Sequence, residues 1–312
     1  MHMKVIVTGA NGFVGTRFMQ YNQARFQLEP LSLRSVDWSK VNLAGIDAVV
    51  HLAGKAHDMH STNDAEYFEI NYDLTKKLAD KAREQGVPHF IYISTVKVYG
   101  DEDREVLNEQ SDCHPEDAYG KSKLQAELYL RSIENNQFRV AIVRPPLVYG
   151  PGVKGNLIRV LGLAGTNLPL PFARTANKRS MVYLDNLVEL LNSILEKRSS
   201  GTFVAGDEHT VSTEELIAEI RRAMHKKPRL ISIPALARSI LRKLKPAFYK
   251  RLFGSFVIDN QNTNKALQFA PPYSFEYGIG RMVEWYQSQS TAAQGSGPLA
   301  QKVSGEKSSG LV

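Results

Sequence analysis

The chain has 312 residues, 43% of them hydrophobic, and a formal net charge of +7 from 39 basic and 32 acidic residues. This length predicts one large domain or two smaller ones, and the charge favours anionic ligands such as phosphates but is too mild for a nucleic-acid binder. The single cysteine, Cys113, excludes an intrachain disulfide and a thiolate metal cluster, and we predict no metal site. No apolar run is long enough to span a membrane, and the chain enters its first strand without room for a signal peptide, so we expect a cytoplasmic protein.

Strand and helix patterns alternate through the first half of the chain. Short apolar runs predict buried parallel strands at residues 3–8, 47–52, 89–94 and 139–144. Helical periodicity predicts helices from Phe13, over about 64–85 and over 119–135. This alternation predicts an α/β fold, a Rossmann-like doubly wound parallel sheet covered by helices on both faces. Only about thirty residues separate the first helix from the strand at 47–52, so the second helix and third strand of such a sheet must be abbreviated.

The pattern changes after Pro145, where Pro, Gly and polar connections become frequent. Further elements are predicted at 184–197 (helix), 202–205 (strand) and 213–224 (helix, with Ser212 or Thr213 as N-cap). We expect residues 1–150 plus about 181–200 to form a dinucleotide-binding domain. Residues 151–180 plus about 201–287 would form a smaller C-terminal substrate-binding region, and the Ser-, Gln- and Gly-rich tail 288–312 is predicted to be disordered.

A glycine-rich turn, TGANGFVG, directly follows the first strand. Gly9 permits the tight turn, Gly12 allows close approach of a pyrophosphate, and Gly15 allows the helix to pack on the strand. The helix N-terminus would offer free N–H groups to the phosphates. A plain strand-to-helix turn is the alternative, but the position between a strand and a helix favours a dinucleotide site.

Tyr119 and Lys123 share one face of the helix at 119–135. A neighbouring ammonium group and a positive nicotinamide ring would favour the phenolate and make Tyr119 an acid/base near neutral pH. Thr95 follows the strand at 89–94, where it would face the ligand crevice of an open α/β sheet. Taken alone, each of these residues also fits an ordinary surface or turn position.

The segments TGANGFVG, HLAG, Asn71, STVKVYG, YGKSK, RPPLVYGPG and RSMVYLDN occur in this order. Together they resemble the extended short-chain dehydrogenase/reductase family, particularly its nucleotide-sugar epimerases, dehydratases and reductases, over about Lys4 to Tyr286. The resemblance implies a catalytic set of Thr95, Tyr119 and Lys123, with Ser94 as a weaker candidate beside Thr95.

The glycine turn and the resemblance together imply a set of cofactor-binding residues: Gly9, Asn11, Gly12, Phe13, Val14, Gly15, Arg34, Leu52, Ala53, Gly54, Asn71, Tyr119, Lys123 and Val148. Thr95, Asn156 and Arg179 match substrate-binding positions, the last two at the nucleotide diphosphate, where a guanidinium group pairs well with phosphate oxygens. Arg251 is a weaker candidate for the same role. The ligand implied is a nucleotide sugar, UDP-linked, and the resemblance also implies a homodimer.

The segment after Thr95 bears on the reaction. The 4,6-dehydratases of the family have Asp-Glu directly after the catalytic Thr, whereas this chain has Val96 and Lys97, so we exclude a dehydratase. The main expectation is an NAD(P)-dependent reductase of a 4-keto sugar in surface polysaccharide biosynthesis. The alternatives are a UDP-hexose or UDP-N-acetylhexosamine 4-epimerase with tightly bound NAD, and a non-catalytic NADP-binding sensor.

The segment LEPLSLRSVDW, which we expect to contain the second strand of the sheet, indicates whether the cofactor is NAD or NADP. An acidic residue at its end binds the adenosine ribose of NAD, whereas an arginine suits the 2′-phosphate of NADP. No acid stands at the expected end and Arg34 does, which modestly favours NADP(H) over NAD(H). Asp37 remains an alternative ribose ligand.

The segment 234–255 is basic with interleaved apolar residues, and Pro246 divides it. It fits a solvated surface, a lid over the diphosphate or an interfacial helix on anionic lipid. We favour the solvated surface, so membrane contact is the less expected outcome.

Overall fold

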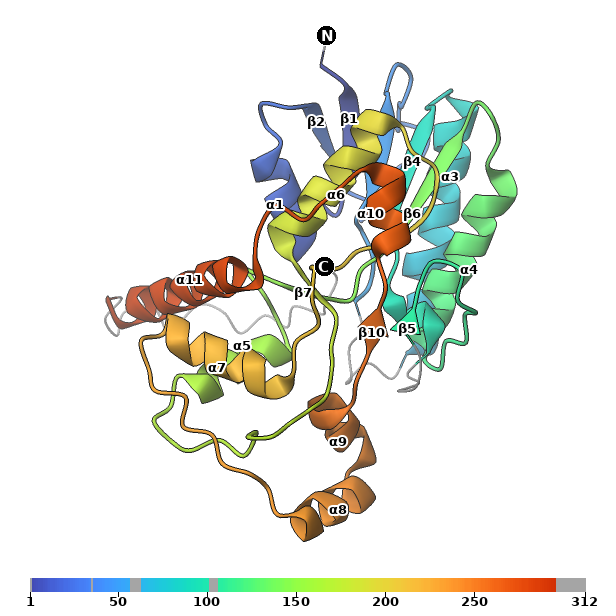
Figure 1. The fold of residues 1–312 in the computed structure, drawn as a ribbon. Coiled ribbons are helices and arrows are strands. Elements are labelled where there is room, and N and C mark those ends of the chain that lie inside the picture. The colour runs from blue at the N-terminus through green and yellow to red at the C-terminus, as the bar shows by residue number, and fades with distance from the viewer. Residues whose placement is uncertain (1, 35, 57–62, 101–105, 296–312) are drawn as a thin grey trace.

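A computed structural model describes residues 2–34, 36–56, 63–100 and 106–295 (Figure 1). Its central sheet has six parallel strands in the order β2-β1-β3-β4-β6-β9. These are β1 (Lys4–Thr8), β2 (Gln27–Leu31), β3 (Ala48–His51), β4 (His89–Ile93), β6 (Arg139–Arg144) and β9 (Gly201–Val204). The order reverses at β1, so the predicted Rossmann-like doubly wound sheet is confirmed and its ligand crevice lies beyond the carboxyl end of β1.

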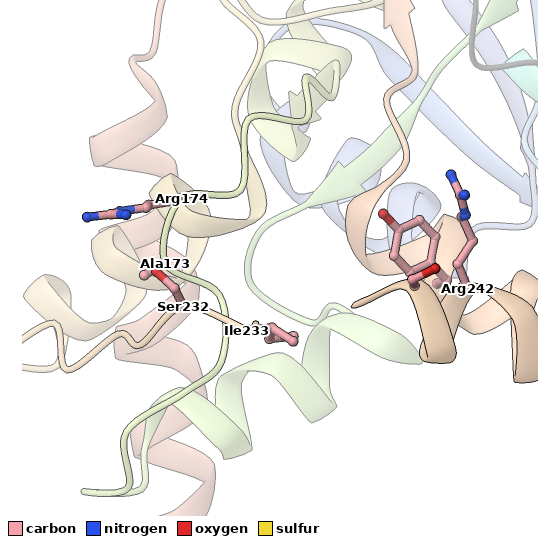
Figure 2. Close-up of a pocket in the computed structure, with 7 residues that line it drawn as sticks. Ala173, Arg174, Ser232, Ile233 and Arg242 are labelled. Carbon is pink, nitrogen blue, oxygen red and sulfur yellow. The ribbon is translucent and has the colours of Figure 1, made fainter. Parts of the chain in front are cut away.

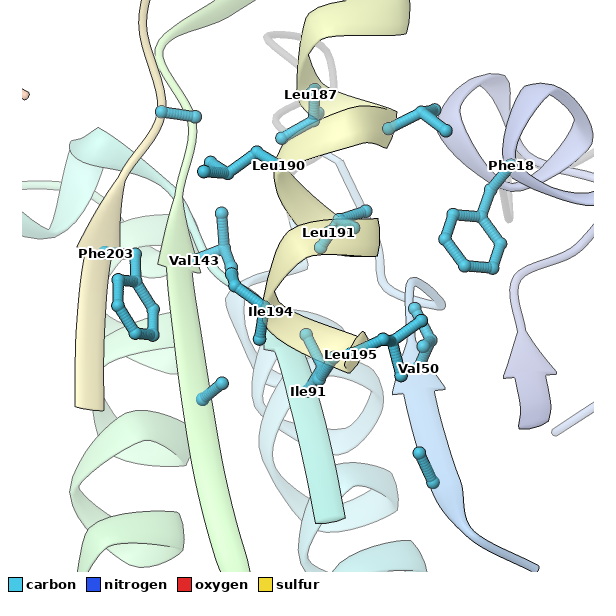
Figure 3. Close-up of a cluster of buried hydrophobic side chains, with 14 of the residues drawn as sticks. Phe18, Val50, Ile91, Val143, Leu187, Leu190, Leu191, Ile194, Leu195 and Phe203 are labelled. Carbon is cyan, nitrogen blue, oxygen red and sulfur yellow. The ribbon is translucent and has the colours of Figure 1, made fainter. Parts of the chain in front are cut away.

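The sheet is packed on both faces because successive side chains of a strand point in opposite directions. Val5 and Val7 of β1 face α1 (Phe13–Tyr21) and α6 (Leu184–Lys197), in the cluster drawn in Figure 3. Ile6 faces the opposite side, where α3 (Leu74–Glu84) and α4 (Ala118–Ile133) supply Leu78, Ala82 and Leu130. Continuous apolar runs were therefore a valid signal for the central strands.

β2 was not recognised as an apolar run because it is an edge strand. It pairs only with β1 within the described sheet, and its residues are half-buried or exposed. Pro30 stands opposite Val7, a position that an edge strand tolerates because one side of its backbone needs no ladder hydrogen bond. Between β2 and β3 the described residues form no helix or strand, which confirms the expected abbreviation.

The helix predicted over 64–85 is interrupted. It consists of α2 (Asp64–Phe68), a π-helical turn (Glu69–Asp73) and α3. Helical periodicity does not report a π turn, which adds one residue to one turn and is often found at functional sites. Asn71 lies in this turn.

A second apolar cluster lies outside the sheet, between α5 (Asn156–Ala164), α7 (Thr213–Ala223) and α11 (Phe275–Gly295). Two short parallel pairs join it to the rest of the chain: β7 (Leu147–Tyr149) with β8 (Met181–Tyr183), and β5 (Val106–Leu107) with β10 (Val257–Ile258). Ser212 is the N-cap of α7, with a capping box to Glu215. The remaining helices are a 3-10 turn (Val96–Tyr99), α8 (Ala235–Leu244), α9 (Pro246–Phe253) and α10 (Gln261–Leu267). The domain boundaries given above stay a prediction.

α11 continues to Gly295 and so includes residues 288–295 of the tail that we predicted to be disordered, while the disorder of the tail stays a prediction. The polar composition hid a helix whose earlier part, including Ile279, Met282 and Val283, is anchored in the second cluster. Residues 296–312 lie outside the described chain. Among the described residues, no helix is long and apolar enough to cross a membrane.

Gly15 is the most constrained glycine of the turn after β1, since a Cβ atom there would lie 2.0 Å from the Gly9 carbonyl oxygen. We expect Gly15→Ala to separate α1 from the turn and to lower the urea midpoint of unfolding. Gly280→Ala in α11 is the matched control, because no atom lies within 4 Å of its added Cβ and alanine favours a helix. Equal midpoints for the two variants would contradict the proposed close packing.

Candidate active site

The glycine turn lies directly against the segment that follows β3. Gly9 has φ +68°, and a Cβ atom on it would lie 2.6 Å from the Ala53 nitrogen. α1 begins at Phe13 with Gly12 as its N-cap, with no side-chain cap and no acidic residue in its first turn. Its positive end therefore faces the crevice without a competing carboxylate on the same turn, as a phosphate site requires.

The segment after β3 connects the turn to the residues of α4. A Cβ atom on Gly54 would lie 2.9 Å from Asn71 Oδ1 and 3.0 Å from Lys123 Nζ, so a side chain there would require the ends of these two side chains to shift. Asn71 Oδ1 accepts from the Lys55 backbone N–H (2.8 Å), and Asn71 Nδ2 donates to the Lys55 carbonyl (3.2 Å) and to Ser122 Oγ (3.1 Å). Asn71 thus clamps the 52–55 segment against α4.

Lys123 is almost fully buried, with its Nζ 2.9 Å from the Ile93 carbonyl oxygen and 4.7 Å from the centre of the Tyr92 ring. Burial lowers the pKa of Lys123 to about 7, and the charge of Glu127 opposes part of that change. The ammonium group is held at the end of β4, next to Gly54.

Tyr119 lies one turn before Lys123, with Thr95 near enough to act on its pKa as a hydrogen-bonding neighbour. The Tyr67 ring packs beside it, with ring centres 6.1 Å apart. Burial raises the pKa of Tyr119 to about 12, and the hydrogen bond with Thr95 opposes this. In the protein alone the pKa of Tyr119 is therefore raised, whereas we expected a nearby ammonium group to lower it.

Thr95 and Ser94 have different environments. Thr95 Oγ1 accepts from the Lys97 backbone N–H (3.2 Å) and faces Tyr119. Ser94 Oγ instead donates to Glu127, whose carboxylate forms a buried bidentate pair with Arg144. The structure therefore brings Thr95, rather than Ser94, to the tyrosine.

A buried chain of hydrogen bonds runs behind the site, through a residue that the sequence analysis did not single out. Thr75 Oγ1 donates to the Asn71 carbonyl (2.8 Å), so it accepts from His51 Nε2 (2.8 Å). His51 Nδ1 in turn accepts from Thr8 Oγ1 (2.6 Å), which accepts from the Ala53 N–H (3.3 Å). Burial lowers the pKa of His51 to about 3, so the ring is neutral and one tautomer serves the whole chain. The HLAG segment could have indicated this chain of hydrogen bonds, because His51 ends a buried strand and a buried histidine needs polar partners.

Arg34 and Asp37, the residues that we expected at the adenosine ribose, both lie at the protein surface. Arg34 is exposed, three residues beyond the end of β2, and its backbone N–H contacts Ser32 Oγ at 3.4 Å. Asp37 is also exposed and binds Ser39 and Lys40, and the hydrogen bonds from these neighbours hold its pKa below the usual value. Neither side chain is held toward the glycine turn by a contact that would decide between NAD and NADP.

The expected diphosphate ligands lie in or against helices α5 and α9. Asn156 is exposed at the first residue of α5. The Arg179 guanidinium group donates to the carbonyls of Lys250 (2.8 Å) and Gly254 (3.0 Å), at the end of α9. Arg251 belongs to α9, but its side chain lies outside the described residues.

A pocket of about 410 Å³ lies between α8, α9 and the loops at 173–174 and 232–233. Figure 2 shows Arg174 on the loop side and Arg242 on α8. Ser239 and Tyr249 also line it. Guanidinium and hydroxyl groups suit an anionic, hydrogen-bonding ligand.

The hydroxyl of Thr75 is the central link of the His51 chain. We expect Thr75→Val, which keeps the side-chain shape, to lower the free energy of unfolding by about 1–3 kcal/mol, because a buried imidazole N–H loses its acceptor. Urea denaturation measures this change. Thr166→Val, where the hydroxyl bonds only the Leu163 carbonyl near the surface, should change it by less than about 0.5 kcal/mol. Similar losses in both variants would argue against the chain.

Known proteins resemble this chain over most of its length. Residues 5–206 match the model of the NAD dependent epimerase/dehydratase family. The chain is 32% identical over 311 residues to a UDP-glucose 4-epimerase of Vibrio cholerae, covering 89% of this chain and 94% of that protein. It is 28% identical over 325 residues to the N-acetyl-alpha-D-glucosaminyl-diphospho-ditrans,octacis-undecaprenol 4-epimerase of Escherichia coli O157:H7, covering 91% and 96%.

Solved structures share the fold. The UDP-glucuronic acid 4-epimerase of Bacillus cereus in complex with NAD has a TM-score of 0.73 at 21% identity, covering 92% of this chain and 99% of that chain. RMD of Pseudomonas aeruginosa complexed with NADPH has a TM-score of 0.72 at 20% identity, with the same coverage. The family match, the long relative above 30% identity and the order of motifs agree, and the chain belongs to the NAD-dependent epimerase/dehydratase family of extended short-chain dehydrogenases/reductases.

Proposed function

We propose that this protein is an NAD-dependent 4-epimerase of a diphosphate-linked sugar, and that its substrate is a UDP-sugar. The observation that carries the proposal is the pairing of Tyr119 with Thr95 beside the buried Lys123, against the glycine turn. This reverses our first preference for a 4-keto reductase. Both relatives described above are named 4-epimerases, and they match this chain over almost their whole length.

The crevice fits a nicotinamide dinucleotide. The uncapped start of α1 and the backbone of Gly12 and Phe13 would hold the diphosphate, while Lys123 would donate to hydroxyls of the nicotinamide ribose. Asn71 keeps the wall at Gly54 in place. A bound nicotinamide would supply the acceptor and donor for the hydride at sugar C4, and its positive ring would favour the phenolate of Tyr119.

Tyr119 supplies the proton chemistry. Its phenolate would accept the proton of the sugar 4-hydroxyl, and the phenol would return it after the keto sugar has turned. The Thr95 hydroxyl lies within hydrogen-bond reach of Tyr119 and would orient the same sugar oxygen. Thr95 is buried and Tyr119 is half-buried, so a bound sugar that covers Tyr119 would exclude water from the proton that moves between them.

The two positions after Thr95 argue against dehydration. Val96 is buried in an apolar cluster with Val98 and Val204. Lys97 forms an ion pair with Asp117, with its Nζ 3.7 Å from Oδ2. An elimination would find neither an acid nor a base at these positions.

The substrate region fits a diphosphate. Arg174, Arg242 and Tyr249 line the pocket beside α8 and α9, and guanidinium groups pair with phosphate oxygens. Arg179 would act at the same place indirectly, since it holds the end of the helix that carries Tyr249. A UDP-sugar and a lipid-linked diphosphosugar share this chemistry, and the higher identity to the UDP-glucose enzyme favours UDP.

NAD replaces NADP as our preferred cofactor. The exposed Arg34 supplied the expectation of NADP, and nothing in the described contacts fixes its guanidinium group for a 2′-phosphate. A non-catalytic sensor has less support, because Thr95, Tyr119 and Lys123 are all present and adjacent.

Replacing Tyr119 with Phe tests the catalytic assignment. We expect kcat for interconversion of UDP-glucose and UDP-galactose to fall by about 10²–10⁴-fold with a smaller change in KM, since only the proton transfer is lost. Tyr277→Phe, at an exposed tyrosine of α11, is the control for removing a phenol. Unchanged turnover in Tyr119→Phe would refute the role of Tyr119.

The cofactor released from the purified, denatured protein distinguishes the two reactions. An epimerase retains its cofactor through the cycle, so we expect stoichiometric NAD by chromatography. Arg34→Ala should leave this content unchanged. An empty site that binds NADPH more tightly than NADH, with the preference lost in Arg34→Ala, would restore the reductase.

A further inference from the structure

Helices α8 and α9 lie at the end of the molecule farthest from the start of the chain (Figure 1). They pack on each other, and the end of α9 is fixed to the body. Asn177 Nδ2 and Arg179 Nε both donate to the Gly254 carbonyl, and Thr213 Oγ1 donates to the Leu252 carbonyl (2.6 Å). The helix pair is therefore a projecting element on a fixed base.

All charged residues of this helix pair are basic. The segment 234–255 contains six basic residues and no acidic residue: Arg238, Arg242, Lys243, Lys245, Lys250 and Arg251. Of those whose side chains are described, Arg242, Lys243, Lys245 and Lys250 are all exposed. A projecting surface of this charge attracts an anionic partner.

Apolar side chains lie beside these cations. Ile240 is 49% exposed and Leu244 is 75% exposed, and the two are one helical turn apart on the same face of α8. Arg242 and Lys243 stand between them in sequence. An exposed apolar stripe with flanking cations is typical of a helix that lies in the interface of a membrane, with its apolar face among the lipid headgroups.

We propose, in place of the solvated surface that we favoured from the sequence, that the α8–α9 pair docks on the surface of an anionic phospholipid bilayer, with Ile240 and Leu244 inserted and the neighbouring lysines on the headgroups. A second copy of this chain is a poorer occupant. A two-fold interface would place the same patch on both sides, and this patch has no carboxylate within 234–255 to pair with the cations. Docking brings the pocket of Arg174, Arg242 and Tyr249 to the bilayer surface, and it does not depend on which sugar the enzyme converts.

Co-sedimentation of the full chain with vesicles tests the proposal. One set of vesicles is pure phosphatidylcholine, and the other contains phosphatidylcholine and phosphatidylglycerol in equal amounts. We expect binding to the anionic vesicles only, falling as salt screens the charges. Lys243→Gln with Lys245→Gln should weaken it by about 25-fold, at roughly fivefold for each cation near the surface. Neither residue lines the pocket.

The matched control removes two cations that belong to the central sheet and not to α8 or α9. Lys4 and Arg139 are exposed at the amino ends of β1 and β6, and Lys4→Gln with Arg139→Gln gives the same net charge as the first double variant. The control should bind like the unchanged protein. Leu244→Ser, which removes only apolar area, should weaken binding by about tenfold.

Three results would overturn the proposal. They are absent binding to anionic vesicles, equal binding to both vesicle types, and an equal loss in the control double variant. If sedimentation velocity instead shows a dimer that Leu244→Ser converts to a monomer, without vesicle binding, the patch is a subunit interface and the membrane proposal is wrong.

Discussion

The buried ammonium group of Lys123 is the constraint around which the site is built. A charged group taken out of water needs polar partners, and here the Ile93 carbonyl and the face of the Tyr92 ring supply them. Gly54 lies beside it, and a side chain at this position would displace the ends of the Lys123 and Asn71 side chains. The end of β4, the segment after β3 and helix α4 are thereby fixed relative to one another, and Tyr119 takes its position one turn before Lys123.

Two buried polar networks keep these elements in place. On one side, a chain of hydrogen bonds through His51 links β1 to α3 and ends at the carbonyl of Asn71 in the π turn. On the other side, Glu127 of α4 binds Arg144 of β6 with both side chains 1–2% exposed. Removing one partner of such a pair leaves an uncompensated charge in the interior, which is strongly destabilising. Both networks stand behind the ligand crevice, where they hold the elements that carry Thr95, Tyr119 and Lys123.

The segment RSMVYLDN has a structural role as well as a diagnostic one. Asp185 forms a bidentate pair with Arg17 of α1 (2.6 and 2.8 Å), and Asn186 Nδ2 donates to Asp207 (2.8 Å). The helix behind the glycine turn is thus tied to α6 and to the substrate region. In the same segment Arg179 holds α9, so a residue matched to diphosphate binding also positions the pocket wall.

Local sequence by itself determined the elements with a strong one-dimensional pattern. The buried strands β1, β3, β4 and β6, the helix at 184–197 and the glycine turn follow from apolar runs, period and stereochemistry. The order of motifs indicated the family, and it predicted the catalytic set of Thr95, Tyr119 and Lys123. Tertiary structure alone decided what depends on partners distant in the chain. It made β2 an edge strand, interrupted the helix at Asn71 with a π turn, continued α11 to Gly295 by packing its earlier residues, and gave His51 its partners. It also separated Thr95 from Ser94, because whether a hydroxyl faces the crevice or a buried carboxylate is set by the elements packed around it.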